Sequence, residues 1–396
     1  MTACCANGWT GGQYSVFRFT LGSYLLIHFA CLVSSAPEIS THPTGIVALL
    51  LAGVGLSALF ALGIRDRFAV LALLSLGIGL FAMNPPISNT SMPFIALILF
   101  AHTFVPTRPY GSWDARGRID PGAGWRLPTA IHTAAWIALA IGYAYSGFTK
   151  LGDPAWIDGS ALLTTLSDPL AAQTLLGELA LLLPPPLLAL ATWSVLALEI
   201  SFAPLAILRK VRPWLWLALL GVQFSLMALG HFADNGAGML MLHFLAFDPA
   251  WVKGIKEQRT ATIFYDGGCG LCHRFVRFAL AEDAEGRHFR FAPLESGGFY
   301  ALRKLSPQAE LLDSIDSVVL SLPNGDLLVR AAATLEIGKR LGGIWRVAAI
   351  AACAVPLGVL DAAYDGIAKI RHRIFATPAE ACPILPAQLR DRFDDD

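Results

Sequence analysis

The stretch Thr262-Ile-Phe-Tyr-Asp-Gly-Gly-Cys-Gly-Leu-Cys-His273 decides the fold of the C-terminal part of the chain. In it an extended apolar run, a glycine turn and two closely spaced thiols follow one another. The run 261–265 is typical of a strand, Asp266-Gly267-Gly268 of a tight turn, and residues 269–280 of a helix. The sequence therefore predicts a strand, a turn and a helix, with a CxxC pair in the first helical turn.

Two thiols at the start of a helix are typical of a redox site. The unpaired backbone N–H groups of the first turn and the positive end of the helix dipole favour the thiolate form of Cys269. Cys269 is therefore the predicted nucleophile. Cys272, one turn later, is predicted to resolve a mixed disulfide.

The alternative for these two cysteines is half of a structural zinc site, which needs a second pair of Cys or His ligands. Only His273 lies near the motif in the sequence. The remaining cysteines are Cys4, Cys5, Cys31, Cys353 and Cys382, and they form no second pair with that spacing. The sequence favours the redox interpretation over zinc and predicts no metal site.

The composition indicates a membrane protein with a soluble C-terminal domain. Of the 396 residues 55% are hydrophobic and 15% charged, against roughly 25% charged in ordinary soluble domains. The charges concentrate from Lys253 onward, which predicts a membrane domain over residues 1–252 and an α/β domain over residues 260–390. The net charge of +0 indicates no nucleic-acid partner.

About eight apolar segments before residue 252 approach the length of a membrane span. They cover residues 15–36, 44–63, 67–83, 92–106, 129–148, 185–207, 213–230 and 236–251. Basic residues follow the second, fourth, sixth and eighth segments, whereas the loops after the first, third and seventh carry none. By the positive-inside rule, this predicts a multi-pass protein of the inner (plasma) membrane with its N-terminus and C-terminal domain in the cytoplasm.

Short strands and amphipathic helices alternate after residue 260. Strands are predicted at 287–291, 316–322 and 327–329, the last two as a hairpin, and a helix at 331–341. A βαβ unit that carries the two thiols, followed by a hairpin and a helix, is a thioredoxin-like topology. The apolar run 344–360 contains Arg346 and Pro356, which favour a packed helix over a ninth span. The acidic end of the chain, from Asp391 to Asp396, predicts a disordered tail.

The segment from Tyr265 to Cys272 resembles the YDGxCxLC signature of the DCC family of thioredoxin-like thiol-disulfide oxidoreductases. Two later stretches extend the resemblance: Val329-Arg330-Ala331-Ala332-Ala333, and Tyr364-Asp365 with Arg371 and Arg373. It implies a thiol-disulfide oxidoreductase with Cys269 and Cys272 as the catalytic pair. The residues that would support the motif are Tyr265, Asp266, Gly267 and Gly268. Tyr364, Asp365, Arg371 and Arg373 would either bind an acidic partner or cap and solvate the last helix.

The apolar part resembles the HTTM domain, a bacterial relative of the membrane region of vitamin K-dependent γ-carboxylase. The residues that carry this resemblance are 145–151 (Tyr-Ser-Gly-Phe-Thr-Lys-Leu) and 156–159 (Trp-Ile-Asp-Gly). It implies that Lys150 is the base that deprotonates a bound hydroquinone. The turn that carries a functional histidine in the carboxylase corresponds to residues 88–91 (Ser-Asn-Thr-Ser) here, so carboxylase chemistry itself is not expected.

Three ionisable residues form a candidate site in the membrane domain. Lys150 ends a long apolar segment, where a lysine either snorkels to the interface or serves as a base. Glu199 lies deep in the sixth segment, where an ionisable group is costly and is either functional or paired with a neighbouring helix. His231 lies beside a glycine-rich turn predicted on the Lys150 side of the membrane. It is preferred as their companion over His102, His132 and His243.

The sequence favours a membrane-bound thiol-disulfide oxidoreductase with a cytoplasmic dithiol. Its partners would be a thiol-bearing protein or small molecule and the lipid bilayer, and a quinone is the cofactor considered for the membrane domain. The predicted topology places the dithiol and Lys150 on opposite faces of the bilayer, about 30 Å apart, which does not favour direct electron transfer between them. The alternative is a membrane maturation or binding module for an exported peptide, in which the thioredoxin-like domain is a non-catalytic recruitment surface. The oligomeric state is not predicted.

Overall fold

The computed structural model describes residues 7–39, 43–83, 91–168, 174–229, 233–255, 260–305, 318–374 and 387–394. The chain divides into two compact units. One comprises residues 17–107 and 128–247, and the other residues 1–16, 108–127 and 248–396. We call them the helical unit and the sheet unit. The sheet unit thus contains an N-terminal segment and one long inter-helix loop in addition to the C-terminal domain.

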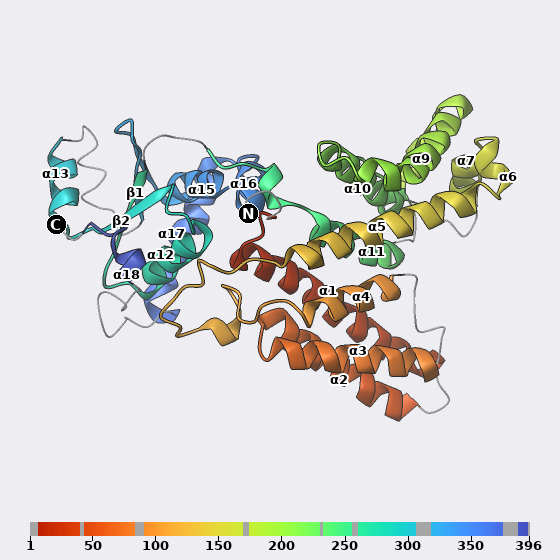
Figure 1. The fold of residues 1–396 in the computed structure, drawn as a ribbon, viewed down its shortest axis with the longest axis horizontal. Helices are drawn as coiled ribbons and strands as arrows, with labels where there is room; N and C mark the ends of the chain where they lie inside the picture. Colours follow the sequence, from red (N-terminus) through yellow and green to blue (C-terminus); the bar gives the residue numbers. More distant parts are fainter. Residues whose placement is uncertain are drawn as a thin grey trace. The chain divides into compact units, whose positions relative to one another are not determined.

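The helical unit contains the apolar helices (Figure 1). The first, α1 (Gly11–Ile39), begins in the sheet unit and continues in the helical unit. The others are α2 (Pro43–Leu62), α3 (Asp66–Met83), α4 (Met92–His102), α5 (Thr129–Lys150), α6 (Pro154–Ile157), α7 (Ala161–Ser167), α8 (Leu175–Leu181), α9 (Pro185–Ala206), α10 (Arg212–Leu229) and α11 (Ala233–Ala246). Each of the eight predicted apolar segments overlaps one of these helices.

The predicted count of eight membrane spans is not confirmed. Within the described residues, five helices are long and apolar enough to cross a membrane: α1, α2, α3, α9 and α10. The apolar helix α4 has only 11 residues, about 16 Å at 1.5 Å per residue, which is short for a hydrocarbon core of about 30 Å. A sixth candidate is the pair Gly343–Ala352 and Leu357–Ile370, which is bent by 115°. Helix formation at these segments follows from the sequence, but the number that cross a bilayer does not.

Gly147 allows α5 and α9 to pack closely. A Cβ atom at this position would lie 3.0 Å from the Ile200 side chain, 3.1 Å from the Ile200 amide nitrogen and 3.2 Å from the Glu199 Cβ. These distances are tighter than ordinary van der Waals contacts, so a side chain at position 147 would push the two helices apart. The contact brings the last turns of α5 next to the middle of α9.

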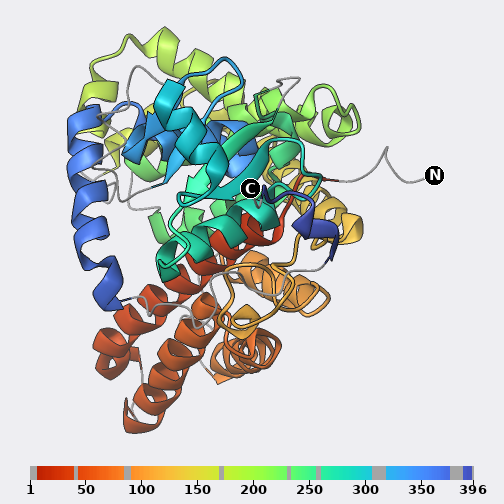
Figure 2. The same cartoon turned by 90° about the vertical axis from the view of Figure 1, so that its left-hand side faces the viewer.

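The sheet unit is built on a four-stranded mixed sheet of order β2-β1-β3-β4, seen from two directions in Figures 1 and 2. Strand β1 (Ala261–Tyr265) pairs in parallel with β2 (Phe289–Pro293) and antiparallel with β3 (Val319–Ser321), which pairs antiparallel with β4 (Leu327–Val329). The helices of this part are α12 (Gly270–Glu282), α13 (Gly297–Leu305), α15 (Arg330–Leu341), α16 (Gly343–Ala352), α17 (Leu357–Ile374) and α18 (Ala387–Arg390). Short 3-10 turns lie at Trp113–Ala115 and Pro249–Trp251.

Alternation of side chains along the strands gives the sheet two apolar faces. On one face Ile263 of β1 and Phe291 of β2 pack with α12 and α15 in a buried cluster. On the other, Phe264 packs against Phe299 of α13, with ring centroids 5.1 Å apart. A core on both faces fixes the register of β1, because a one-residue shift would exchange the two sets of side chains.

The predicted strand at 287–291 lies two residues later than expected, at Phe289–Pro293. The cause is Asp283, whose buried carboxylate accepts hydrogen bonds from the amides of Arg287, His288 and Phe289 at 3.0–3.1 Å. These bonds hold residues 287 and 288 in the turn that follows α12, so that pairing with β1 starts at Phe289.

Residues 391–394 of the acidic tail lie against the sheet, contrary to the predicted disorder, and residues 395 and 396 lie outside the described part of the chain. Residues 387–390 form α18, and Phe393 forms a parallel bridge with Phe291 of β2. Arginine side chains on β2 and within the tail neutralise the nearby carboxylates, which a count of acidic residues in one segment could not indicate.

Candidate dithiol site

The turn between β1 and α12 places the first cysteine at the helix start. The side chain of Asp266 accepts a hydrogen bond from the Gly268 amide at 2.8 Å. The Cys269 amide donates to the Asp266 carbonyl at 3.3 Å. Cys269 is the N-cap residue of α12, with φ −100° and ψ 117°. This local structure agrees with the strand, turn and helix that the sequence predicts.

Both cysteines are buried thiols. Cys269 is 1% exposed and Cys272 3% exposed, and both belong to the apolar cluster under α12. The His273 amide donates to the Cys269 carbonyl at 3.1 Å, so the two cysteines lie in the same first helical turn. Both thiols thus begin the same helix, and an external substrate needs access to a buried sulfur.

His273 stabilises the turn that carries the dithiol. One ring nitrogen, Nε2, lies 2.8 Å from the Gly267 carbonyl, and because a carbonyl only accepts, Nε2 carries the proton. The ring also packs edge-on against Tyr265, with centroids 6.0 Å apart. The sequence interpretation considered His273 only as a zinc ligand. Its position four residues after Cys269, on the same helix face, was the available signal.

The opposite end of α12 carries a buried carboxylate that joins it to the N-terminal segment. Glu282 accepts hydrogen bonds from the Thr10 hydroxyl at 2.5 Å, the Gly12 amide at 2.9 Å and the Trp345 indole at 2.5 Å. The Gly12 amide is in the first turn of α1, so Glu282 caps that helix. Burial raises the pKa of Glu282, and the three donors oppose that shift only in part.

The loop 108–127 also packs on the dithiol helix. The Tyr110 hydroxyl donates to the Arg274 carbonyl at 2.9 Å, and burial raises the Tyr110 pKa to about 12. The Arg277 guanidinium donates to the carbonyls of Arg118 and Ile119. Two segments distant in sequence, the N-terminal segment and the loop 108–127, therefore contact α12, and no local pattern indicated these contacts.

Of the four residues considered for partner binding, two have described side chains. The Tyr364 hydroxyl accepts a hydrogen bond from the Val318 amide at 3.4 Å, next to β3. Asp365 forms an ion pair with Arg330 at 3.4 Å, and both side chains are more than 40% exposed. The side chains of Arg371 and Arg373 lie outside the described residues. Tyr364 and Asp365 thus support the β3 and α15 region, and binding of a partner there stays a prediction.

In the helical unit the structure brings Lys150 and Glu199 together. The Lys150 Nζ lies 2.6 and 2.7 Å from the two carboxylate oxygens of Glu199, and 4.4 Å from the centre of the Trp156 ring. The Glu199 side chain is 5% exposed and that of Lys150 20%. Glu199 therefore has a cationic partner on a neighbouring helix. His231 lies outside the described residues.

A second polar group, not predicted as a site, lies in the same unit. The Tyr143 hydroxyl is 3.2 Å from His243 Nε2 and accepts a hydrogen bond from Gln223 at 3.3 Å. These side chains come from α5, α10 and α11. Spacing along the chain gave no signal for this group, because its members are 20 to 100 residues apart.

Over the described part of the chain, no group of three or more His, Cys, Asp or Glu side chains is arranged to hold a metal ion. The dithiol has His273 beside it, but the His273 ring is engaged with the Gly267 carbonyl.

Comparison with known proteins relates the sheet unit to a described family. A model of DCC1-like thiol-disulfide oxidoreductases matches residues 263–377. The uncharacterized protein YuxK of Bacillus subtilis (strain 168) is 30% identical over 131 residues, which are 33% of this chain and 91% of YuxK. A chloroplastic DCC family protein of Arabidopsis thaliana is 30% identical over 138 residues, or 34% of this chain and 77% of that protein.

No solved structure matches the chain. The family match starts at residue 263 and leaves the apolar helices uncovered, so the resemblance of those helices to the HTTM domain stays a prediction.

Proposed function

The chain belongs, through its C-terminal domain, to the DCC1-like thiol-disulfide oxidoreductase family, and from this we propose that it exchanges disulfides with a thiol-bearing protein or small molecule through Cys269 and Cys272. The observation that carries the proposal is the position of the pair. Cys269 is the N-cap of α12, directly after a central strand, and Cys272 follows in the same turn. A thiolate there gains from the helix dipole and from the unpaired N–H groups of the first turn.

The exchange needs two steps. The Cys269 thiolate attacks one sulfur of a substrate disulfide, which forms a mixed disulfide and releases the other substrate sulfur as a thiolate. The Cys272 thiolate then attacks Cys269 Sγ, which closes the Cys269–Cys272 disulfide and releases the second substrate thiolate. The dithiol loses two electrons and the substrate gains them, and the same steps in reverse oxidise a substrate dithiol. His273 and Asp266 hold the turn during both steps.

The test is disulfide exchange by the full chain with a model disulfide. Cys269→Ser is expected to abolish the exchange, and Cys353→Ser, which changes an exposed cysteine outside the site, is the matched control. Equal activity of Cys269→Ser and the unchanged protein would rule out the proposal. Such a result would favour the alternative, a recruitment domain without chemistry attached to a maturation or binding module for an exported peptide.

We also propose that the chain is a multi-pass protein of the plasma membrane with its dithiol in the cytoplasm. The apolar helices support a location in a membrane. The basic residues that follow the second, fourth, sixth and eighth apolar segments support the sidedness. Labelling of single-cysteine variants from one side of sealed vesicles tests the sidedness. Protection of a cysteine placed in the loop 108–127 from a reagent on the cytoplasmic side would contradict it.

For the helical unit we propose that Lys150 and Glu199 form an ionisable site of the membrane, with a lipid-soluble quinone as the candidate ligand. The buried ion pair supports a specialised site, because charges within apolar helices are costly. Because Lys150 Nζ contacts both carboxylate oxygens of Glu199, a ligand would have to compete with Glu199 for Lys150. Quinone binding to detergent-solubilised protein and to Lys150→Met tests this, and equal binding by both would reject it.

A further inference from the structure

The outer edge of β2 is paired with the end of the same chain. The Phe291 amide donates to the Arg392 carbonyl at 2.9 Å, and the Asp394 amide donates to the Phe291 carbonyl at 2.9 Å. Phe393 is the bridge partner of Phe291 in a parallel arrangement. Residues 392–394 therefore lie on the sheet as a short fifth strand would. They satisfy backbone groups that an edge strand otherwise leaves open.

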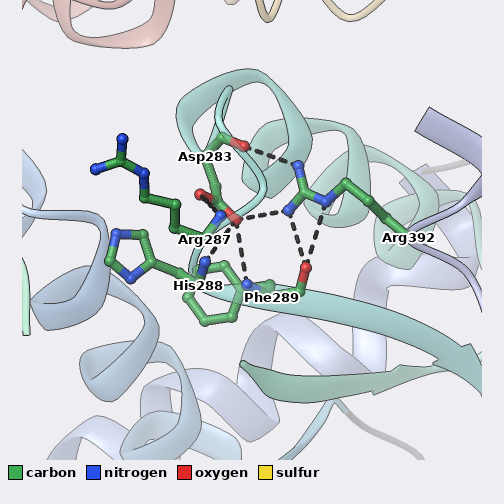
Figure 3. Close-up of polar contacts among 5 residues, drawn as sticks. All are labelled: Asp283, Arg287, His288, Phe289 and Arg392. Carbon is green, nitrogen blue, oxygen red and sulfur yellow. Dashed lines mark hydrogen bonds and ion pairs between the residues drawn. The ribbon is translucent and has the colours of Figure 1, made fainter. Parts of the chain in front are cut away.

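Two arginine–carboxylate pairs hold this segment (Figure 3 shows the inner one). The Arg392 guanidinium donates to the Asp283 carboxylate at 2.6 Å, to the Asp283 carbonyl at 2.7 Å and to the Phe289 carbonyl at 3.0 Å. The side chains of Arg392 and Asp283 are only 11% and 2% exposed. The outer pair joins Arg290 to Asp394, and its side chains are 42% and 43% exposed.

The segment also closes the apolar cluster that contains the dithiol. The Phe393 ring stacks on Phe291 with centroids 5.2 Å apart, and it meets the Tyr265 ring edge-on at 6.4 Å. Tyr265 in turn contacts His273. Phe393 and Leu389 pack against the buried cluster to which Cys269 and Cys272 belong. A contact path of three rings thus leads from the chain end to the helix turn of the two thiols.

A segment attached in this way can leave as a unit. It binds through one backbone bridge, two ion pairs and two apolar side chains, and an extended segment of another protein can make the same kind of contacts with a sheet edge. We propose that the edge of β2 is a docking surface for an extended segment with the pattern Arg-aromatic-Asp, and that residues 387–394 of the chain occupy it as a displaceable cover of the dithiol. A protein substrate that presents such a segment displaces the cover and gains access to Cys269.

The proposal rests on the proposed function only in taking Cys269 as the reacting thiol, and its test does not use enzymatic activity. The rate of alkylation of Cys269 by iodoacetamide is measured in the full chain by mass spectrometry of the peptide that contains it. We expect Cys269 to be alkylated on the order of tenfold faster in two variants, a chain that ends at residue 386 and Arg392→Gln. Each variant loses the charged hydrogen bonds of Arg392 that hold the cover on the sheet. Arg287→Gln is the matched control. The Arg287 side chain is 75% exposed, pairs with Glu285 and points away from Arg392 in Figure 3.

A synthetic peptide of residues 387–396 added to the shortened chain is expected to bind and to restore slow alkylation, whereas the same peptide with Gln in place of the second arginine is not. An unchanged alkylation rate in Arg392→Gln, or a shortened chain whose thiols the peptide does not protect, overturns the proposal. If the shortened chain does not fold, the alkylation rate of Cys269 in Arg392→Gln still decides. Competition between the free peptide and residues 387–394 of the unchanged chain for the edge of β2 is the second measurement. Loss of disulfide exchange in Cys269→Ser, together with unchanged alkylation in Arg392→Gln, would reject the cover and leave the proposed function intact.

Discussion

Replacement of Glu282 by alanine tests whether the dithiol helix is anchored to the N-terminal segment. The carboxylate of Glu282 is the common acceptor for the Thr10 hydroxyl, the Gly12 amide and the Trp345 indole. Gly12 is itself adapted to this contact, because a Cβ atom there would lie 2.5 Å from a carboxylate oxygen. The substitution removes the acceptor and leaves three donors in a buried place.

The magnitude follows from those three donors. A buried donor that loses its partner costs about 1–3 kcal/mol, and the loss of a helix cap costs about 0.5–2 kcal/mol. The Thr10 hydroxyl can rotate to another acceptor, and removal of a buried charge returns part of its desolvation cost. We expect Glu282→Ala to lower the free energy of unfolding of the sheet unit by about 3 kcal/mol. Glu282→Gln is expected to cost less, about 1–2 kcal/mol, since its amide oxygen keeps two donors while its amide nitrogen faces the third.

The assay is thermal unfolding of the detergent-solubilised chain, followed by tryptophan fluorescence. About 3 kcal/mol corresponds to a decrease in Tm of roughly 6–12 °C for a unit of this size. The matched control is Glu285→Ala on the same turn, whose side chain is 59% exposed and contacts an exposed arginine; we expect it to change the free energy by less than about 0.5 kcal/mol. Equal Tm values for Glu282→Ala and Glu285→Ala would refute the anchoring role of Glu282.

Four further outcomes are expected. Burial raises the pKa of Glu282 in the folded state above the ordinary value of 4.5, so the folded state binds this proton more tightly than the unfolded state. The contribution of Glu282 to stability is therefore fully present below the unfolded pKa and is lost as pH rises through the folded pKa. This loss should be absent in Glu282→Gln, and identical pH profiles of Tm for the two proteins would contradict it. Lys150→Met and Glu199→Gln each leave the other charge without its partner, and each is expected to lower the free energy of unfolding by about 2–4 kcal/mol. In a double-mutant cycle the double variant should lose less than the sum of the two single variants. Additive losses would show that the two charges are not coupled. Gly147→Leu should destabilise the helical unit by about 1–3 kcal/mol, because the new leucine side chain meets Ile200. The control Gly221→Leu should not destabilise it, because the space around Gly221 is open. Equal Tm values for the two variants would reject the close approach of α5 and α9. Cys272→Ser is expected to accumulate the mixed disulfide on Cys269, detected by mass under non-reducing conditions, and release of substrate at the normal rate would exclude Cys272 as the resolving thiol.

The sequence predicted the parts of this protein that depend on neighbours along the chain. The strand and helix around the dithiol, the hairpin after residue 318 and the apolar helices all follow from side-chain periodicity and turn residues, and the structure contains them. The sequence also identified Lys150 and Glu199 separately as unusual charges. The predicted number of eight spans is not confirmed, because five helices within the described residues are long and apolar enough to cross a membrane.

The tertiary structure decided what surrounds the two thiols. The sequence indicated that Cys269 and Cys272 begin a helix, but their burial follows from packing with strands and with the chain end. Because both thiols are buried, the access of a substrate to Cys269 matters as well as the reactivity of its thiolate. The contacts that matter join residues 49 positions apart for Lys150 and Glu199, 109 for Asp283 and Arg392, and 272 for Thr10 and Glu282. Periodicity and spacing describe at most a few helical turns, so such pairs have no local signature. They form only when the folded backbone brings distant polar groups together in a place where water no longer competes for them.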